Sequence, residues 1–276
     1  MSYSVPAVET AIKLLNYLKA DAQGQRSLAE VCDALDIPRS SGFNIMKTME
    51  KYGFVRFDND SKRYSLGWAL VELGARASEQ MSYVEVLRPY LRALGRATGL
   101  TCVLAQRAGD NLIMLDKVES SNDIRVTATV GQLYPLAAGA LGKVLMAYLD
   151  VEAIQSYVAR RGLPRATQNA ITDVGVFLEE LVEVRRVGFA KSFEEYVRGV
   201  NVVASPIFDS AGRVELAVAA LGLTSALPVE QVEEFGSKVL TVARQMTSAL
   251  GGAWRGPLLQ DSVAQVIGEG DDISPR

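Results

Sequence analysis

Residues 27–66 read SLAEVCDALDIPRSSGFNIMKTMEKYGFVRFDNDSKRYSL, and this stretch predicts the fold of the N-terminal part of the chain. Ser27 and Glu30 have the capping-box pattern S-x-x-E, which starts a short second helix. Pro38 disfavours helical geometry in the residue before it and suits a helix start, so a third helix should run from about residue 39 to residue 52. Gly53 is then its expected left-handed cap.

Two further elements complete a small domain around these helices. Upstream, apolar residues recur at helical spacing over residues 7–20, which predicts an amphipathic first helix. Downstream, residues 54–57 and 62–66 alternate on either side of the turn signals at 58–61, which predicts a β-hairpin. A hairpin directly after the third helix is where a wing belongs, so residues 1–66 are expected to form a winged helix-turn-helix.

The polar face of the expected third helix carries hydroxyl, amide and cationic side chains and no carboxylate. Hydroxyls and lysines can contact phosphates, and an asparagine can address a base edge, so this face suits the major groove of DNA. The alternative is a small helical bundle with a solvated polar face. The residues expected to bind double-stranded DNA are Ser27, Arg39, Ser40, Ser41, Asn44 and Lys47, with Lys62 and Arg63 near the hairpin tip.

The composition limits the other functions that the chain could have. Its 276 residues favour two domains. It has no histidine, which excludes Ser/His/Asp and Cys/His nucleophile systems and His-containing zinc sites, and Cys32 and Cys102 cannot supply four thiolates. We therefore expect no enzyme activity, catalytic residue, cofactor or metal. Chemistry based on carboxylates, lysine or a bound cofactor stays open as the alternative.

The charge distribution favours DNA binding only weakly. Residues 1–66 carry nine Lys or Arg and eight Asp or Glu, whereas the whole chain has a net charge of −3. Any binding to DNA must depend on where the charges lie rather than on their number. No apolar run approaches the roughly 20 residues that cross a membrane, and the N-terminus lacks a signal-peptide layout. With two free, buried thiols expected, the chain should act in the cytoplasm, without a membrane partner.

The rest of the chain predicts a linker helix over residues 67–82, a larger domain over 83–256 and a poorly ordered tail over 257–276. Strands in hairpins with helices grouped around them indicate an α+β domain on an antiparallel sheet. The expected strands are 101–106, 111–118, 124–130, 188–194, 200–208 and 214–222, and the expected helices are 83–98, 139–149, 150–160, 173–187 and 228–253.

Several stretches, in order over roughly residues 5–250, resemble the IclR family of bacterial transcriptional regulators. They are DIPRSSGF at 36–43, MEKYGFV at 49–55, RYSLG at 63–67, LDKVES at 115–120 with IRV at 124–126, PLAAGALGKVL at 135–145, and EE at 194–195 with GVNVVASPIFD at 199–209. The resemblance implies that the larger domain is a GAF- or profilin-like effector domain. It also implies that the linker helix helps to pair two chains, although packing on the winged domain explains its apolar residues equally well.

The same resemblance implies a homo-oligomer, either a dimer or a dimer of dimers, that binds a palindromic operator. It favours a repressor over an activator. The rival hypotheses are an enzyme with an attached DNA module and a protein–protein module whose winged domain no longer binds DNA. The motif at 139–143 is not a phosphate loop, because its spacing is G-x-x-G-K and Val144 replaces the required Ser or Thr. Glu194 and Glu195 are expected to be solvated or structural rather than catalytic, since no partner acid or metal ligand set accompanies them.

The resemblance also implies where an effector binds. The start of the helix at 139 would present backbone N–H groups to a carboxylate. Ala137 stands where many family members have histidine, and residues 217–222 lack the serines of relatives that bind keto acids. A small, mostly hydrophobic molecule with one polar end, such as an aromatic acid or a lactone-like catabolite, is therefore expected. The expected effector-binding residues are Thr127, Thr129, Leu136, Ala138, Gly139, Ala140, Leu141, Ser192, Val202, Ala219 and Leu221.

Overall fold

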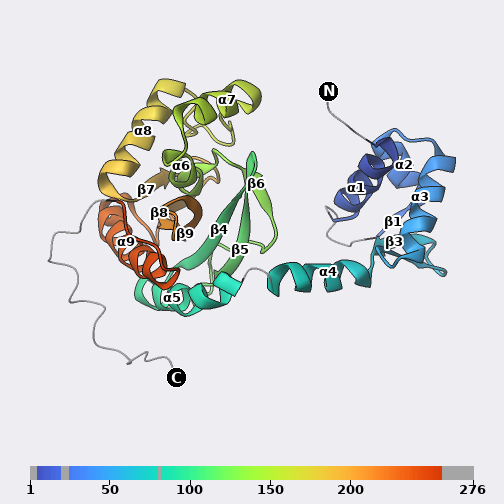
Figure 1. The fold of residues 1–276 in the computed structure, drawn as a ribbon, viewed down its shortest axis with the longest axis horizontal. Coiled ribbons are helices and arrows are strands. Elements are labelled where there is room, and N and C mark those ends of the chain that lie inside the picture. The colour runs from blue at the N-terminus through green and yellow to red at the C-terminus, as the bar shows by residue number, and fades with distance from the viewer. Residues whose placement is uncertain (1–4, 20–24, 80–81, 257–276) are drawn as a thin grey trace. The chain divides into compact units, whose positions relative to one another are not determined.

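The computed structural model describes residues 5–19, 25–79 and 82–256. The predicted tail at 257–276 lies outside the described residues. The chain folds as two compact units, one ending at Ser82 and the other beginning at Tyr83 (Figure 1). Cys32 and Cys102 are both buried free thiols, as expected.

The first unit is a winged helix-turn-helix, in which three helices pack on a small antiparallel sheet of order β1-β3-β2. Its elements are α1 (Pro6–Lys19), β1 (Arg26–Ser27), α2 (Leu28–Leu35), α3 (Arg39–Lys51), β2 (Val55–Asp58), β3 (Arg63–Leu66) and α4 (Trp68–Glu79). The core of this unit contains Leu14, Leu18, Val31, Met46, Met49, Val55 and Tyr64. Strands β2 and β3 form the hairpin that the sequence predicts after the third helix.

Local signals in the sequence explain where the helices of this unit begin and end. Ser27 Oγ accepts from the backbone N–H of Glu30 at 3.2 Å, and Glu30 Oε2 accepts from the N–H of Ser27 at 2.6 Å, which confirms the capping box. Pro38 precedes α3, and Gly53 has the left-handed φ of +74° beyond its end. Phe43 is an apolar residue of α3 that helical spacing would place inside with Met46 and Met49, but its side chain is 46% exposed.

The second unit is built on a six-stranded antiparallel sheet of order β6-β5-β4-β9-β8-β7. The strands are β4 (Thr101–Ala108), β5 (Asn111–Val118), β6 (Leu133–Pro135), β7 (Ala190–Phe193), β8 (Val200–Phe208) and β9 (Val214–Leu223). The helices are α5 (Ser82–Thr98), α6 (Gly139–Ala147), α7 (Val151–Arg161), α8 (Val174–Val187), the 3-10 turn η1 (Val229–Gln231) and α9 (Val232–Ala249). These elements form the predicted α+β domain, in which the sheet curls among its helices (Figure 1).

Each face of the sheet has its own apolar core. Helices α6, α7 and α8 supply the core on one face, and α5 and α9 supply the core on the other. Adjacent residues of β4 alternate between the two, because successive side chains of a strand point to opposite faces. Val103 and Ala105 join the first core, whereas Cys102 and Leu104 join the second. This covering of both faces explains why β4, β8 and β9 are almost continuously apolar.

Two predicted elements of this unit differ in the structure. Residues 124–130 are not a strand, and the edge strand next to β5 is β6 instead. Side chains hold the 124–130 segment, for example through the Thr101 hydroxyl, which donates to the Val126 carbonyl at 2.5 Å. The predicted helix at 228–253 begins with η1 and ends at Ala249, close to Gly251 with its φ of +69°. In the described part of the chain, no helix is long and apolar enough to cross a membrane.

Candidate DNA-binding face and effector cavity

Most of the residues expected to bind DNA lie on the exposed surface of α3. Arg39, Ser40, Ser41, Asn44 and Lys47 are all exposed there. The Arg39 guanidinium is 3.9 Å from Asp33, and both side chains are about 70% exposed, so this ion pair is weak and leaves the guanidinium open to solvent. Lys62 is exposed in the turn just before β3, in the wing.

Besides Arg39, three of the expected DNA contacts have partners inside the winged unit. Ser27 is used in the capping box of α2. Arg63 donates to the Gln25 carbonyl at 3.1 Å and lies 3.4 Å from Glu30. Lys47 Nζ is 2.8 Å from Glu50, whose carboxylate raises the pKa of the lysine. The polar face of α3 therefore has a carboxylate beside it, contrary to the expectation from the sequence. Of these three, only Lys47 is exposed.

A cavity is present in the second unit, on the side of the sheet covered by α6. Its volume is about 90 Å³. It is lined by Leu112, Met114, Thr127, Ala128, Tyr134, Ala138, Gly139, Ala140, Leu141, Ser192, Tyr196, Val197, Val200, Val202 and Leu221. The structure therefore brings together Thr127, Ala138, Gly139, Ala140, Leu141, Ser192, Val202 and Leu221 from the expected effector-binding set.

Three residues of the expected set do not line this cavity. Thr129 is exposed, because residues 124–130 do not form the strand on which Thr127 and Thr129 would share a face. Leu136 and Ala219 are buried in the apolar core of that side of the sheet. Both contribute to packing rather than to the cavity surface.

Seven residues of the cavity wall were not expected from the sequence: Leu112, Met114, Ala128, Tyr134, Tyr196, Val197 and Val200. The alternation along β5 could have revealed Leu112 and Met114, since they are two residues apart and face the same side. Tyr134 and Tyr196 carry no such signal. They come from β6 and from the segment between β7 and β8, which only the folded sheet brings together.

The start of α6 supplies unpaired polar groups to the cavity. The first N–H groups of a helix lack intrahelical acceptors, and no side chain caps α6 at Ala138. Gly139 has φ +55°, and a Cβ there would be 3.2 Å from Ser192 Oγ. Ser192 is a buried residue, and its hydroxyl makes no hydrogen bond to the residues that the structure describes. Backbone donors and a free hydroxyl at a helix start can hold a carboxylate.

A buried lysine on α6 lies next to this region. Lys143 Nζ is 2.7 Å from Glu195 Oε1, 2.8 Å from Glu180 Oε2 and 2.9 Å from the Lys191 carbonyl. Burial raises the pKa of Glu195, while Lys143 acts in the opposite direction. Glu194 accepts from the N–H of Gly199 at 2.7 Å. Both glutamates of the motif therefore have structural partners.

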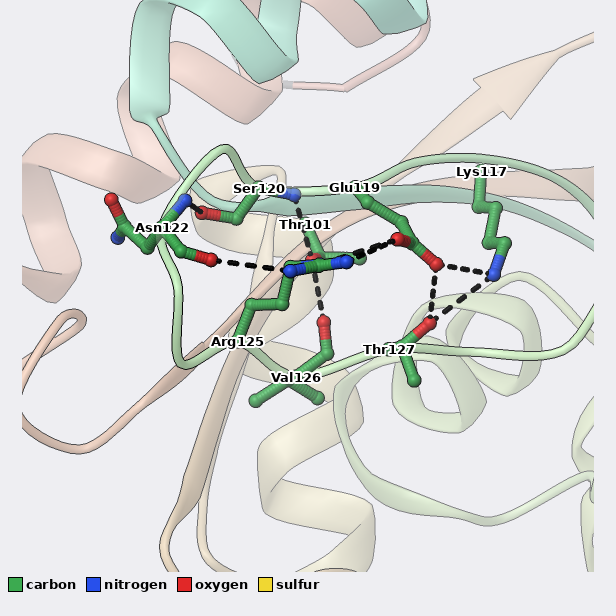
Figure 2. A network of polar contacts seen from close by, with 8 residues as sticks. All are labelled: Thr101, Lys117, Glu119, Ser120, Asn122, Arg125, Val126 and Thr127. Atoms are coloured by element: carbon green, nitrogen blue, oxygen red, sulfur yellow. Dashed lines mark hydrogen bonds and ion pairs between the residues drawn. The ribbon is translucent and has the colours of Figure 1, made fainter.

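A polar network holds the segment that carries Thr127 (Figure 2). Glu119 accepts from Lys117 Nζ at 2.6 Å, from the Thr127 hydroxyl at 2.7 Å and from the Arg125 guanidinium at 3.2 Å. These bonds, with that from Lys117 first, lower the pKa of Glu119 to about 2. The Ser120 N–H donates to Thr101 Oγ1 at 3.1 Å. Side-chain bonds thus replace the backbone ladder that was expected at residues 124–130.

Comparison with known protein families shows which family has both units. The IclR helix-turn-helix domain matches residues 7–59, and the C-terminal domain of the bacterial transcriptional regulator IclR matches residues 75–248. The chain belongs to the IclR family. This confirms the resemblance seen in the sequence, and membership makes the protein a DNA-binding transcriptional regulator and not an enzyme. No group of three or more potential metal ligands occurs among the described residues.

Individual members of the IclR family resemble the chain over most of its length. The HTH-type transcriptional repressor AllR of Klebsiella pneumoniae is 30% identical over 245 residues, which are 89% of this chain and 90% of AllR. The structure of an IclR transcriptional regulator from Alicyclobacillus acidocaldarius has a TM-score of 0.79 and 31% identity, covering 90% of this chain and 100% of that one.

A third relative has a ligand in its structure. It is an IclR homologue from Microbacterium hydrocarbonoxydans complexed with 4-hydroxybenzoate, with a TM-score of 0.76 and 18% identity, covering 88% of this chain and 98% of its own. At that identity the likeness shows a common fold.

Proposed function

We propose that this IclR-family regulator binds a palindromic operator as a homo-oligomer, through α3 and the wing. The observation that supports this most is the row of exposed polar side chains on α3, among which Ser40, Ser41 and Asn44 carry no charge and Arg39 is open to solvent. Hydroxyl and amide groups of this kind contact phosphates and base edges. Two copies related by a twofold axis would meet the two halves of a palindrome.

Exposed apolar side chains on α4 support the pairing of two copies. Trp68 is 69% exposed, and Val71 and Leu73 are also exposed. Gly53 packs close to the Trp68 indole, so this tryptophan touches the winged unit as well. Sedimentation of the purified chain would measure the oligomeric state, and a monomer at micromolar concentration would contradict the proposal. We further infer repression, since AllR relatives are repressors, and action in the cytoplasm, where bacterial DNA lies.

The DNA-binding proposal is tested with fragments of genomic DNA that the full chain retains, followed by anisotropy titrations at several salt concentrations. Arg39→Ala removes a phosphate contact, so it should weaken binding to all sequences and reduce the salt slope by about 1. Asn44→Ala should cost about 1–3 kcal/mol on the operator and relax preference at one base pair. Arg213→Ala removes an exposed charge from the second unit and is the matched control. Arg213→Ala should bind the operator as the parent chain does. If Arg39→Ala and Asn44→Ala also bind it as the parent chain does, the assigned DNA-binding face is disproved.

We propose that the cavity in the second unit binds a small organic acid that changes operator affinity. The unpaired Ser192 hydroxyl and the N–H groups at the start of α6 suit a carboxylate, and the other walls are mostly apolar. The homologue bound to 4-hydroxybenzoate supports an acid of hydrophobic or aromatic character. A ligand acts on operator affinity only through its different affinity for the two states of the protein.

A thermal-shift screen of small and aromatic acids tests this site, because a ligand that binds only the folded state raises its stability. Ala140→Trp should fill the cavity, abolish the shift and leave operator binding intact. Val151→Trp places the same side chain at an exposed position of α7 and should keep the response. A response that survives Ala140→Trp would place the effector elsewhere.

A further inference from the structure

Two tyrosines form part of the cavity wall and come from opposite edges of the sheet. Tyr134 lies on β6, the edge strand on one side, and Tyr196 follows β7, the edge strand on the other side. Their rings meet edge to face, with centroids 5.8 Å apart and planes at 72°. The curl of the sheet therefore brings its two edges together at this pair.

Packing rather than hydrogen bonding holds the two rings. Both tyrosines are half-buried, and burial raises the pKa of each phenol. Neither hydroxyl has a hydrogen-bond partner among the residues that the structure describes. A ring without a polar anchor can change its rotamer at the cost of packing alone, which makes these side chains adjustable parts of the wall.

The cavity between them is small for an organic ligand. Its volume is about 90 Å³. Pockets for drug-sized ligands measure about 300–1,000 Å³. A cavity well below that range favours a short linear acid over one that carries a six-membered ring. The tyrosine rings are the largest side chains in the wall.

The backbone around Tyr196 is fastened on both sides. Glu195 pairs with the buried Lys143 at 2.7 Å, and the Thr167 hydroxyl donates to the Glu194 carbonyl at 2.7 Å. The Gly199 N–H closes the segment on the Glu194 carboxylate. Additional space must therefore come from rotation of the Tyr196 side chain and not from opening of the segment.

We propose that Tyr134 and Tyr196 set the size limit of the effector, so that short linear monocarboxylic acids fit directly and aromatic acids enter only when the Tyr196 ring rotates away. This inference rests on the proposed acid-binding function of the cavity. Tyr196 then determines specificity, and Ser192 with the start of α6 would hold the carboxylate common to all these acids.

The test uses straight-chain monocarboxylates from acetate to octanoate, and benzoate, titrated calorimetrically into the purified full chain. In the parent protein, affinity should rise about fourfold with each added CH₂ up to a short optimum and then fall. Tyr196→Ala should move the optimum to acids at least about two carbons longer and tighten benzoate binding about tenfold or more. Tyr196→Leu should give a smaller change in the same direction if the alanine variant folds poorly.

Two controls separate ring size from other effects. Tyr196→Phe keeps the ring and should leave the optimum length unchanged. Tyr90→Ala removes a half-buried tyrosine of α5 that packs against the other face of the sheet, and should also leave it unchanged. If the parent protein binds acids and Tyr196→Ala has the same length optimum, the size limit is overturned and the acid site stands. If neither protein binds any acid, the acid site itself is overturned, and the size limit with it.

Discussion

Replacing Lys143 with methionine should destabilise the second unit by about 3–5 kcal/mol, the usual cost of removing one partner from a buried ion pair. The Lys143 side chain is only 2% exposed and donates to two carboxylates and a carbonyl. Methionine is similar in length, so packing changes little, but it donates nothing. Glu195, with a side chain 12% exposed, would be left charged in the interior, whereas Glu180, at 40%, can remain hydrated.

The loss should depend on pH in a definite direction. Burial already raises the pKa of Glu195 above its ordinary value of 4.5, and Lys143 opposes that rise. Without the lysine the folded-state pKa rises further, so the folded state binds a proton more readily than the unfolded state does. The loss of stability in Lys143→Met is then complete above the folded-state pKa of Glu195, and it disappears as pH falls below the pKa of this carboxyl in the unfolded chain. The deficit relative to the parent chain should therefore be largest at alkaline pH and shrink as pH falls towards 4.5.

Urea unfolding followed by Trp254 fluorescence measures this free energy, since Trp254 packs on Phe208 in the second unit. A Trp68→Phe background removes the other tryptophan of the sequence. Adding Glu195→Gln to Lys143→Met removes the stranded charge and should restore most of the stability.

Lys191→Met is the matched control for Lys143→Met, because it breaks a pair with the exposed Glu233 and should cost less than about 1 kcal/mol. A deficit that is the same at every pH, with no recovery in the double variant, would refute the ion-pair explanation and indicate simple packing loss.

Two further substitutions test the winged unit and the polar network. Gly42→Ala would place a Cβ against the Cys32 sulfur where α2 meets α3, so we expect a lower melting temperature of the winged unit and a loss of stability of about 1–3 kcal/mol. Adding Cys32→Ala to the same chain should restore the stability. An unchanged stability in the single variant would contradict the close packing. Glu119→Gln keeps the shape and removes the charge, so hydrogen exchange at residues 121–130 should quicken at neutral pH. Because the pKa of Glu119 is lowered to about 2, its stabilising effect is complete above about pH 4.5 and is lost as pH falls towards 2, and only the parent chain should show that decline.

The winged unit could be predicted in detail because its signals are local. The capping box at Ser27, the proline before α3 and the left-handed Gly53 each act within a few residues, and the structure has all three. The exposure of Phe43 was not predictable in this way, since an apolar residue at helical spacing is expected inside. Its position depends on how far α2 and the wing cover α3, which is a matter of packing.

The segment at 124–130 shows where local reasoning fails. Its alternating residues predict a strand, yet the Glu119 carboxylate accepts hydrogen bonds from Lys117, Arg125 and Thr127. These side-chain bonds hold the segment in place. Such bonds compete with a backbone ladder, and their outcome depends on partners that lie up to 25 residues away, as with Thr101 and Val126.

The sequence by itself determined the two-part organisation and the family, because these depend on periodicity, on caps and on motifs contiguous in the chain. The family resemblance then pointed to the helix start at residue 139 as the expected place for an acid. Only the tertiary structure decided the size of the cavity. Its wall joins Tyr134 and Tyr196 from opposite edges of a sheet, and its framework joins Lys143 to Glu195 across 52 residues. Contacts between such distant residues arise from the curl of the sheet and the packing of α6 on it, which no local pattern encodes.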